Sequence, residues 1–225
     1  MDARQAGTPP VAGLVLAAGA GRRYGRPKAL VERDGQLLVE RASATARDGG
    51  CRPVVTVLGA AAAAVRARAD LGAAIVIDNP GWATGMGSSL RAGIAALWAT
   101  EAVAGIAALW ATEAVAVIVL LVDMPGVTPE AVRRLTVLAS PDALAMAGYG
   151  SHRGHPVLLG RAHWADVAAL AVGDVGARPY LRDRAADLRV VPCGDIASGA
   201  DLDTDQDKEN GPGTDRASGH RGRHA

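Results

Sequence analysis

The chain contains no phenylalanine, and aromatic residues make up only 3% of its 225 residues. Surfaces that bind single-stranded nucleic acid stack bases on several aromatic rings, so this scarcity argues against such a surface. The formal net charge is only +1, which provides no general attraction to nucleic acid or to an anionic membrane. We therefore expect neither nucleic acid nor a membrane among the partners.

Cysteine and long apolar runs are also scarce. Cys51 and Cys193 form no closely spaced pair and indicate no disulfide framework, which is typical of a reducing compartment. The early apolar stretch at residues 11–20 is too short to span a bilayer. Its arginines follow it, whereas a signal peptide places its positive charges first. We expect a cytoplasmic protein.

Short apolar runs rich in β-branched residues alternate with alanine- and leucine-rich stretches of helical character. The predicted strands cover residues 11–16, 53–58, 73–77, 115–122 and 188–191. The predicted helices cover residues 36–47, 60–69, 88–99 and 129–139, the last with Thr128 as N-cap and Pro129 at its first position. This alternation predicts the α/β class, with three layers and a mostly parallel twisted sheet between helices.

The length corresponds to one domain, which we place at residues 11–205. Residues 1–10 are predicted to be a flexible N-terminus. Residues 206–225 are polar and rich in Gly, Asp and Arg, which predicts a disordered tail.

Residues 93–104 recur without change as residues 105–116. Two copies are too few for a solenoid, so the repeat indicates a tandem duplication of a coding segment. One copy advances a helix by about 18 Å and rotates its face by about 120°, so both copies cannot face the same core. We expect one copy to take the native place and the other to lengthen the helix or form a surface hairpin.

The most informative segment, residues 16–30, follows the first predicted strand. Gly19, Gly21 and Gly25 allow a tight turn and bring backbone N–H groups close to a ligand. Positive charge is concentrated in the same loop, at Arg22, Arg23, Arg26 and Lys28. This combination predicts a phosphate-binding loop. The glycine spacing matches neither the P-loop nor the G-x-G-x-x-G loop of dinucleotide-binding folds.

The pattern L-A-A-G-x-G-x-R-x-G-x-P-K-x-L resembles the signature loop of nucleotidyltransferases that join an NTP to a phosphate monoester. It is most similar to the MocA-like molybdenum cofactor cytidylyltransferases, relatives of the MobA guanylyltransferases. Further segments that agree with this MobA/MocA-like family lie at residues 79–90, 123–125, 153–156, 173–178 and 201–204. The resemblance implies a Rossmann-like fold of the nucleotide-diphospho-sugar transferase type. It also implies transfer of CMP from CTP to the phosphate of a molybdopterin-type cofactor, with a molybdenum hydroxylase as one conceivable recipient of the product.

The resemblance implies a role for each matching residue. Lys28 would contact the phosphates at the reacting centre and Arg22 the leaving pyrophosphate, and with Asp123 they form the predicted catalytic set. The predicted nucleotide-binding residues are Leu16, Ala17, Ala18, Gly19, Gly21, Arg22, Lys28, Asn79, Gly85, Ser88 and Ser89. A role for Ser88 and Ser89 as helix N-cap residues explains them equally well.

Asp123 is the predicted metal ligand because it ends an apolar strand and Pro125 prevents that strand from continuing. Carboxylate oxygens suit Mg²⁺, which takes one or two protein carboxylates together with substrate phosphates. Asp203, or else Asp201, is the candidate for the second carboxylate. The predicted acceptor-side residues are His155, Asp174 and Arg178, although an ion pair of structural value explains the last two equally well.

Two other functions remain open from the sequence alone. The first is an NTP transferase of the guanylyl or sugar-phosphate type, which would keep the fold and change the substrates. The second is a non-catalytic maturation factor for a molybdoenzyme, with catalysis lost through the duplication. Binding of a nicotinamide dinucleotide is disfavoured by the glycine spacing and by the basic loop.

Overall fold

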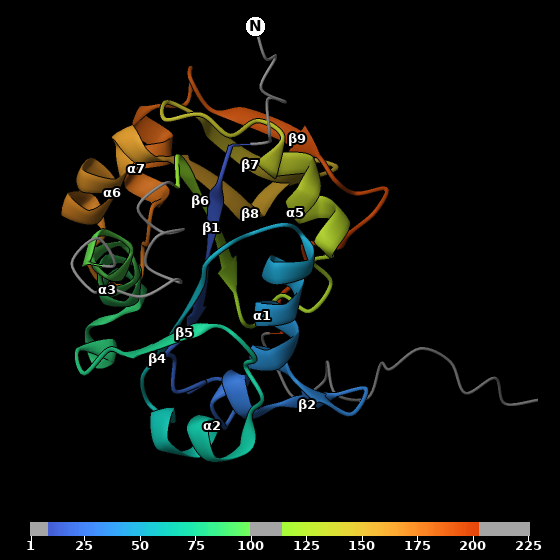
Figure 1. The fold of residues 1–225 in the computed structure, drawn as a ribbon, viewed down its shortest axis with the longest axis vertical. Helices are drawn as coiled ribbons and strands as arrows, with labels where there is room; N and C mark the ends of the chain where they lie inside the picture. The colour runs from blue at the N-terminus through green and yellow to red at the C-terminus, as the bar shows by residue number, and fades with distance from the viewer. Residues whose placement is uncertain (1–8, 100–113, 203–225) are drawn as a thin grey trace, which may run out of the picture.

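The computed structural model describes residues 9–99 and 114–202. Its centre is a seven-stranded sheet with the strand order β5-β4-β1-β6-β8-β7-β9 (Figure 1). The strands are β1 (Val11–Ala17), β4 (Val54–Leu58), β5 (Ile75–Asp78), β6 (Ala116–Leu121), β7 (Leu144–Tyr149), β8 (His152–Gly160) and β9 (Arg189–Pro192). Within this sheet β8 runs antiparallel to β6 and β7, and the other pairs are parallel. The predicted α/β class with a mostly parallel sheet is confirmed.

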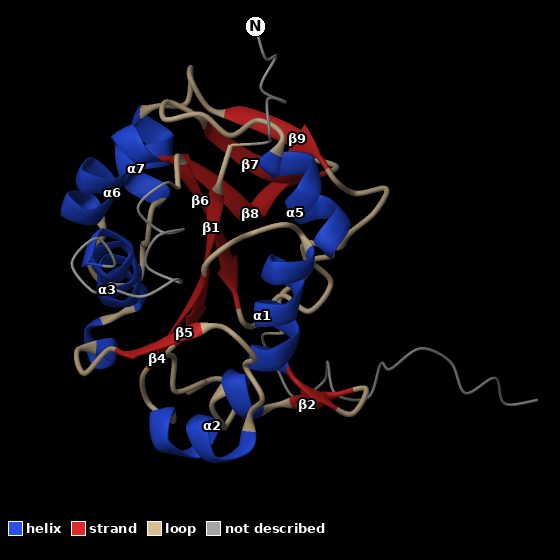
Figure 2. Cartoon of the chain, viewed as in Figure 1, coloured by secondary structure: helices blue, strands red, loops and turns tan. Residues whose placement is uncertain are grey.

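Helices cover both faces of the sheet and complete three layers (Figures 1 and 2). One face carries α3 (Met86–Ala99), α6 (Trp164–Leu170) and α7 (Arg178–Asp183), and the other carries α1 (Leu38–Asp48) and α5 (Pro129–Thr136). The side chains of β1 alternate between the two cores, as a strand requires. Val15 packs in the cluster of α1 and α5, and Leu14 and Leu16 pack in the cluster of α3 and α6.

The remaining elements are short and lie around this framework. Helix α2 (Ala62–Arg68) follows β4 and buries Val65 in the core on the α1 side. Strands β2 (Glu32–Arg33) and β3 (Gln36–Leu37) form a small antiparallel pair before α1. The 3-10 turns are η1 (Lys28–Leu30), η2 (Trp82–Thr84) and η3 (Arg161–His163). None of the helices in residues 9–99 and 114–202 has the length and apolar character needed to span a bilayer.

Helix starts show one confirmed prediction and one correction. The Thr128 hydroxyl accepts a hydrogen bond from the N–H of Ala131 at 3.2 Å, so Thr128 is the N-cap of α5 as predicted. Helix α3, however, begins at Met86 and not at Ser88. Ser88 and Ser89 lie inside its first turn, so the alternative role of these serines as N-cap residues is wrong.

The two copies of the repeat are joined to different elements. Residues 93–99 of the first copy form the second half of α3, where Ile94 and Leu97 are buried. Residues 114–116 of the second copy lead into β6, which begins at Ala116. The predicted helix extension or surface hairpin falls on residues 100–113, which lie outside the described residues, as do residues 1–8 and the tail at 206–225.

Candidate active site

The glycine loop and Asp123 meet where the strand order of the sheet reverses. The chain first adds β4 and β5 on one side of β1 and then returns to place β6 on the other side. Ligands of open α/β sheets bind at such a point, beyond the carboxyl ends of the strands. The glycine loop follows β1, and Asp123 follows β6 after one intervening residue, Val122. The N–H of Val122 bonds the carbonyl of Leu16 at 3.2 Å and ties the two strand ends together.

Lys28 and Asp123 form the charged pair at the centre of this site. The Lys28 Nζ atom lies 3.0 Å from Asp123 Oδ2, across 95 positions of sequence. The two side chains are 13% and 25% exposed, so both remain accessible from the rim of the sheet. The structure therefore brings together Lys28 and Asp123, two members of the predicted catalytic set. An ammonium group and a carboxylate side by side can bind a phosphate and a divalent cation together.

The glycine loop is shaped by Gly21 and anchored by Tyr24. Gly21 has a φ of +62°, and a Cβ atom there would collide with the carbonyl of Arg26, so only glycine fits. Tyr24 is 3% exposed, whereas its neighbours Arg22 and Arg23 are exposed. The buried ring fixes the middle of the loop while the guanidinium groups stay at the surface. Binding of phosphate by Arg22 remains a prediction.

Ala18, the residue after β1, contacts the loop that follows β4. The Ala18 carbonyl accepts a hydrogen bond from the N–H of Ala60 at 3.0 Å. A Cβ atom at Gly59 would lie 2.6 Å from that carbonyl oxygen and from the Cβ of Trp82, so this approach requires glycine. Gly19, in contrast, has open space around it. Of the predicted segment 16–19, Gly19 is thus the residue whose backbone a ligand can approach most closely.

The second loop of the site, residues 79–89, carries the predicted nucleotide-binding residues Asn79, Gly85, Ser88 and Ser89, and a buried polar network holds it. The Asn79 side-chain amide donates to the hydroxyls of Ser88 at 2.8 Å and Ser89 at 3.1 Å. Its carbonyl oxygen accepts from the N–H of Gly81 at 3.0 Å. The Ser88 hydroxyl also bonds the carbonyls of Gly81 and Gly85. These side chains fix the shape of the loop, and their contact with a nucleotide stays a prediction.

The three predicted acceptor-side residues separate into two groups. Burial lowers the pKa of His155 to about 4, the negative charge of Asp123 opposes this shift, and the positive charge of Arg178 reinforces it. His155 therefore lies within electrostatic reach of Asp123 and of Arg178, and it is neutral at pH 7. Asp174 instead contacts the second loop, where its carboxylate accepts a hydrogen bond from the N–H of Met86 at 3.3 Å.

The closing segment returns to Asp123 along the main chain. The N–H of Leu202 donates to the carbonyl of Asp123 at 2.9 Å, and the N–H of Ser198 donates to that of Gly126 at 2.9 Å. Asp201 is exposed beside this contact. Asp203, the preferred candidate for a second carboxylate, lies outside the described residues.

The donor set at the site suits a metal that is shared with a substrate. Among the described residues there is no group of three or more His, Cys, Asp or Glu side chains that could enclose a metal. Asp123 provides one partly exposed carboxylate. Mg²⁺ often binds through one or two carboxylates and completes its octahedron with water and phosphate oxygens. The residues present therefore fit such an ion.

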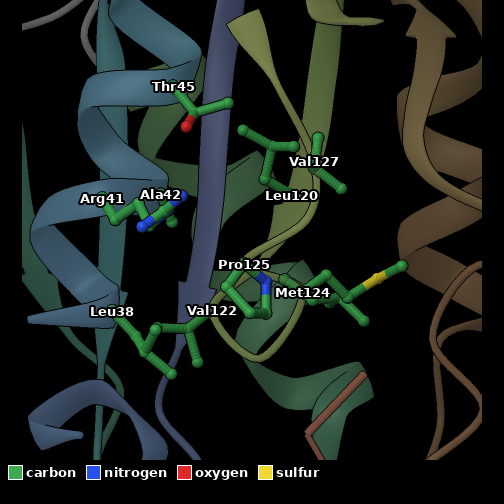
Figure 3. A pocket seen from close by; sticks show the side chains of 10 residues that line it. Leu38, Arg41, Ala42, Thr45, Leu120, Val122, Met124, Pro125 and Val127 are labelled. Carbon is green, nitrogen blue, oxygen red and sulfur yellow. The ribbon is translucent and has the colours of Figure 1, made fainter. Parts of the chain in front are cut away.

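A small pocket between α1 and the end of β6 is not the substrate site. It has a volume of about 10 Å³ and lies between α1, β6 and residues 124–127. Figure 3 shows its mostly apolar lining, with Leu38 and Val122 on one side and Pro125 beside them. This volume corresponds to about one water molecule, so the pocket is a gap in packing.

Some residues of the site carried no recognised signal in the sequence. Gly59 follows directly on the apolar run of β4, and a glycine at a strand end was the available sign of a close backbone approach. Tyr24 is a single aromatic residue among the arginines of the first loop, and this was the available sign that its ring is buried and anchors the loop. The contact of Asp174 with the second loop spans 88 positions, and no local pattern predicts it.

The sheet order, the basic glycine loop and the aspartate after β6 define a nucleotidyltransferase of the α/β class. Residues 13–189 match the MobA-like NTP transferase domain, and the chain belongs to this family. The predicted MobA/MocA-like family is thus confirmed.

The chain is similar to a curated protein and to several solved structures. The nicotine blue oxidoreductase of Paenarthrobacter nicotinovorans is 41% identical over 204 residues, covering 87% of this chain and 93% of the relative. The crystal structure of Rv0371c from Mycobacterium tuberculosis H37Rv has a TM-score of 0.70 at 26% identity, over 89% of this chain and 96% of that chain. A second structure of Rv0371c, in complex with manganese, has a TM-score of 0.64 at 25% identity, over 86% and 92% of the two chains. The molybdopterin-guanine dinucleotide biosynthesis protein A of Archaeoglobus fulgidus shares the fold, with a TM-score of 0.58 at 17% identity over 87% and 93%.

Proposed function

We propose that this protein is a Mg²⁺-dependent nucleotidyltransferase that transfers CMP from CTP to the phosphate of a molybdopterin-type cofactor and releases pyrophosphate. The observation that carries the proposal is the 3.0 Å contact between the Lys28 ammonium and the Asp123 carboxylate. This pair lies where a basic glycine loop meets the end of β6, at the switch point of the sheet.

The chemistry requires positioning and charge stabilisation, and no covalent nucleophile. An oxygen of the acceptor phosphate attacks the α-phosphorus of the NTP, and the bond to the bridging oxygen breaks as pyrophosphate leaves. Negative charge spreads over the phosphoryl oxygens during this step, and Lys28 would neutralise it. Arg22, in the same loop, would hold the leaving pyrophosphate.

Mg²⁺ bound at Asp123 would add positive charge next to the phosphate oxygens. The metal is supported by the carboxylate that Asp123 offers and by the manganese complex of Rv0371c. Mn²⁺ and Mg²⁺ both prefer oxygen ligands in octahedral sites. Asp203 remains the proposed second carboxylate, because the preceding residue, Leu202, donates a main-chain hydrogen bond to the carbonyl of Asp123.

The nucleotide and the acceptor rest on finer features of the loops. The Ala17-Ala18 pair and the sequence Gly-Met-Gly-Ser-Ser-Leu at residues 85–90 resemble the cytidine-using branch and differ from the L-A-G-G pattern of guanylyltransferases. On the acceptor side, neutral His155 can offer a hydrogen bond next to Asp123, and Arg178 supplies a positive charge. These groups suit an anionic acceptor such as a phosphate monoester.

The test is the release of pyrophosphate in the presence of Mg²⁺, comparing CTP, GTP, ATP and UTP with and without molybdenum-loaded pterin cofactor. We expect release with CTP and cofactor together, and none after chelation of the metal. Release with GTP would assign the protein to the guanylyl branch, and release with a sugar phosphate would change the acceptor. Tight binding of cofactor without any turnover would indicate a maturation factor.

A second candidate function follows from the 41% identical relative, whose name describes an oxidoreductase of nicotine blue. If this chain shares that activity, it should change the absorbance of nicotine blue when an electron donor is added, with the donor consumed in proportion. The glycine spacing in residues 19–25 argues against a conventional dinucleotide-binding loop. Turnover of the dye without any NTP would nevertheless favour the oxidoreductase over the transferase.

A further inference from the structure

The second loop is held from outside by a segment far away in the sequence, residues 171–174. The Asp174 carboxylate accepts a hydrogen bond from the N–H of Met86, the first residue of α3, at 3.3 Å. The Gly173 carbonyl accepts from the N–H of Gly87 at 2.8 Å. The guanidinium of Arg91, one turn further along α3, donates to the carbonyl of Ala171. Three successive points of the segment thus contact one side of the first two turns of α3.

The helix start depends on these contacts because its first N–H groups have no partners within the helix. A carboxylate at this end is also favoured by the helix dipole. In most helices the N-cap residue of the same chain segment fills this role. Here the residue before the helix is Gly85, which has no side chain to offer, and Asp174 provides the acceptor instead.

The glycines of the loop are matched to this docking. A Cβ atom at Gly85 would collide with the backbone of Gly173, and its φ of +108° also favours glycine. A Cβ atom at Gly87 would collide with the carbonyl of Ala171. The Met86 sulfur lies 3.3 Å from the position that a Cβ of Gly176 would take. The close fit therefore extends across both partners.

We propose that Asp174 is a positioning residue, which fixes residues 85–88 for the nucleotide. This proposal rests on the proposed function, because it concerns the nucleotide of that reaction.

The first test does not depend on activity. Amide hydrogen exchange is measured in the nucleotide-free full chain for the wild type, Asp174→Ala, Asp174→Asn and Asp183→Ala. Asp183 is an exposed carboxylate in α7 that forms an ion pair with the adjacent Arg182. Its replacement is therefore the matched control. We expect faster exchange at residues 86–88 in Asp174→Ala only, since asparagine keeps an oxygen acceptor. Unchanged exchange in Asp174→Ala would overturn the proposal.

The second test measures the nucleotide. Loss of a helix-capping acceptor corresponds to about a fivefold change in an equilibrium. We expect KM for the NTP to rise about fivefold in Asp174→Ala with little change in kcat, recovery in Asp174→Asn, and no change in Asp183→Ala. An equal KM in all four proteins would contradict the positioning role. A loss of the fold would appear instead as a fall in kcat and Tm together.

A third variant approaches the contact from the other partner. Gly87→Ala should displace the Ala171 carbonyl and weaken nucleotide binding in the same way as Asp174→Ala. If both act through one contact, the double variant should bind no more weakly than Gly87→Ala alone, whereas additive effects would show two independent roles. If the wild type binds no nucleotide at all, the proposed function fails, and hydrogen exchange alone still decides whether Asp174 holds the loop.

Discussion

Among single residues, the proposed transfer reaction depends most on the charges that follow β1 and β6. Lys28 and Asp123 neutralise each other at 3.0 Å in the structure and would be re-partnered by phosphate and metal in a complex. The two side chains of this pair are less exposed than those of a surface pair such as Arg41 with Asp34. Exposed pairs contribute little because water and salt screen them.

Replacement of Lys28 tests this role. Lys28→Ala should lower kcat/KM for the NTP by about 10²–10³, because a preorganised positive charge at the transferred phosphate is lost. Lys28→Arg should recover part of the rate, and Arg41→Ala should leave it unchanged. The measurement is steady-state pyrophosphate release, and an unchanged kcat/KM for Lys28→Ala would show that this charge is not catalytic.

His155 gives a prediction for pH. Burial lowers its pKa from 6.5 to about 4, so below pH 6.5 the unfolded chain binds a proton that the folded chain does not. The contribution of neutral His155 to stability is therefore present above pH 6.5 and is lost as the pH falls towards 4. We expect this loss to amount to about 2 kcal/mol, reduced from the full value because His155 is only partly buried.

The free energy of unfolding, measured by denaturant titration at pH 7 and pH 4.5, checks this prediction. His155→Gln should flatten the dependence on pH, whereas His152→Gln, at an exposed position, should keep it. Equal pH dependence in the wild type and His155→Gln would contradict the shifted pKa.

At the scale of elements, long apolar runs were predictable and short or interrupted ones were not. The strands β1, β4, β5, β6 and β9 and the helices α1, α2, α3 and α5 all coincide with predicted segments to within a few residues. The hairpin of β7 and β8 was not predicted, because His152, Gly154 and Pro156 interrupt its pattern. Helices α6 and α7 are too short for helical periodicity to stand out.

The candidate site shows the same division. Lys28 and Asp123 could be placed together from the sequence because both follow apolar strands, whose carboxyl ends share one edge of a parallel sheet. The docking of Asp174 on α3 could not, because it depends on how the chain folds over 88 positions. The mutual bonding of Asn79, Ser88 and Ser89 was likewise invisible in their spacing.

Two glycines of the first loop should respond differently to substitution. Gly21→Ala should destabilise the loop, because its Cβ would collide with the Arg26 carbonyl and its φ is +62°. Gly19→Ala has open space and should leave the free energy of unfolding within about 0.5 kcal/mol of wild type. If the NTP approaches the backbone at Gly19, this variant should still raise KM. Thermal unfolding and KM together check both statements, and a wild-type KM for Gly19→Ala would remove Gly19 from the nucleotide site.

At the scale of the whole molecule, the site and the repeat lie at opposite ends of the same two elements. The second substrate loop adjoins the start of α3 and Asp123 follows the end of β6, whereas the repeat joins the end of α3 to the start of β6. The duplication can therefore leave the site intact while it changes the connection.

Deletion of residues 105–116 tests this separation. Because the repeat is perfect, the shortened chain keeps the sequences that form α3 and β6. We expect a soluble variant with kcat/KM within about twofold of the full chain, since no residue at the strand ends changes. A fall in activity with retained Tm would show that the added segment reaches the site, and loss of soluble protein would show that the fold requires it.

Our proposal makes this rim of the sheet the place of nucleotidyl transfer, with a metal bound at Asp123. The most direct measurement is Mg²⁺-dependent pyrophosphate release from CTP and pterin cofactor by the wild type and by Asp123→Asn, with Asp48→Asn as a surface control. We expect release by the wild type and the control, and a loss of at least about 10² in rate for Asp123→Asn at unchanged Tm. Equal rates in all three proteins, or release that persists after chelation of the metal, would contradict it.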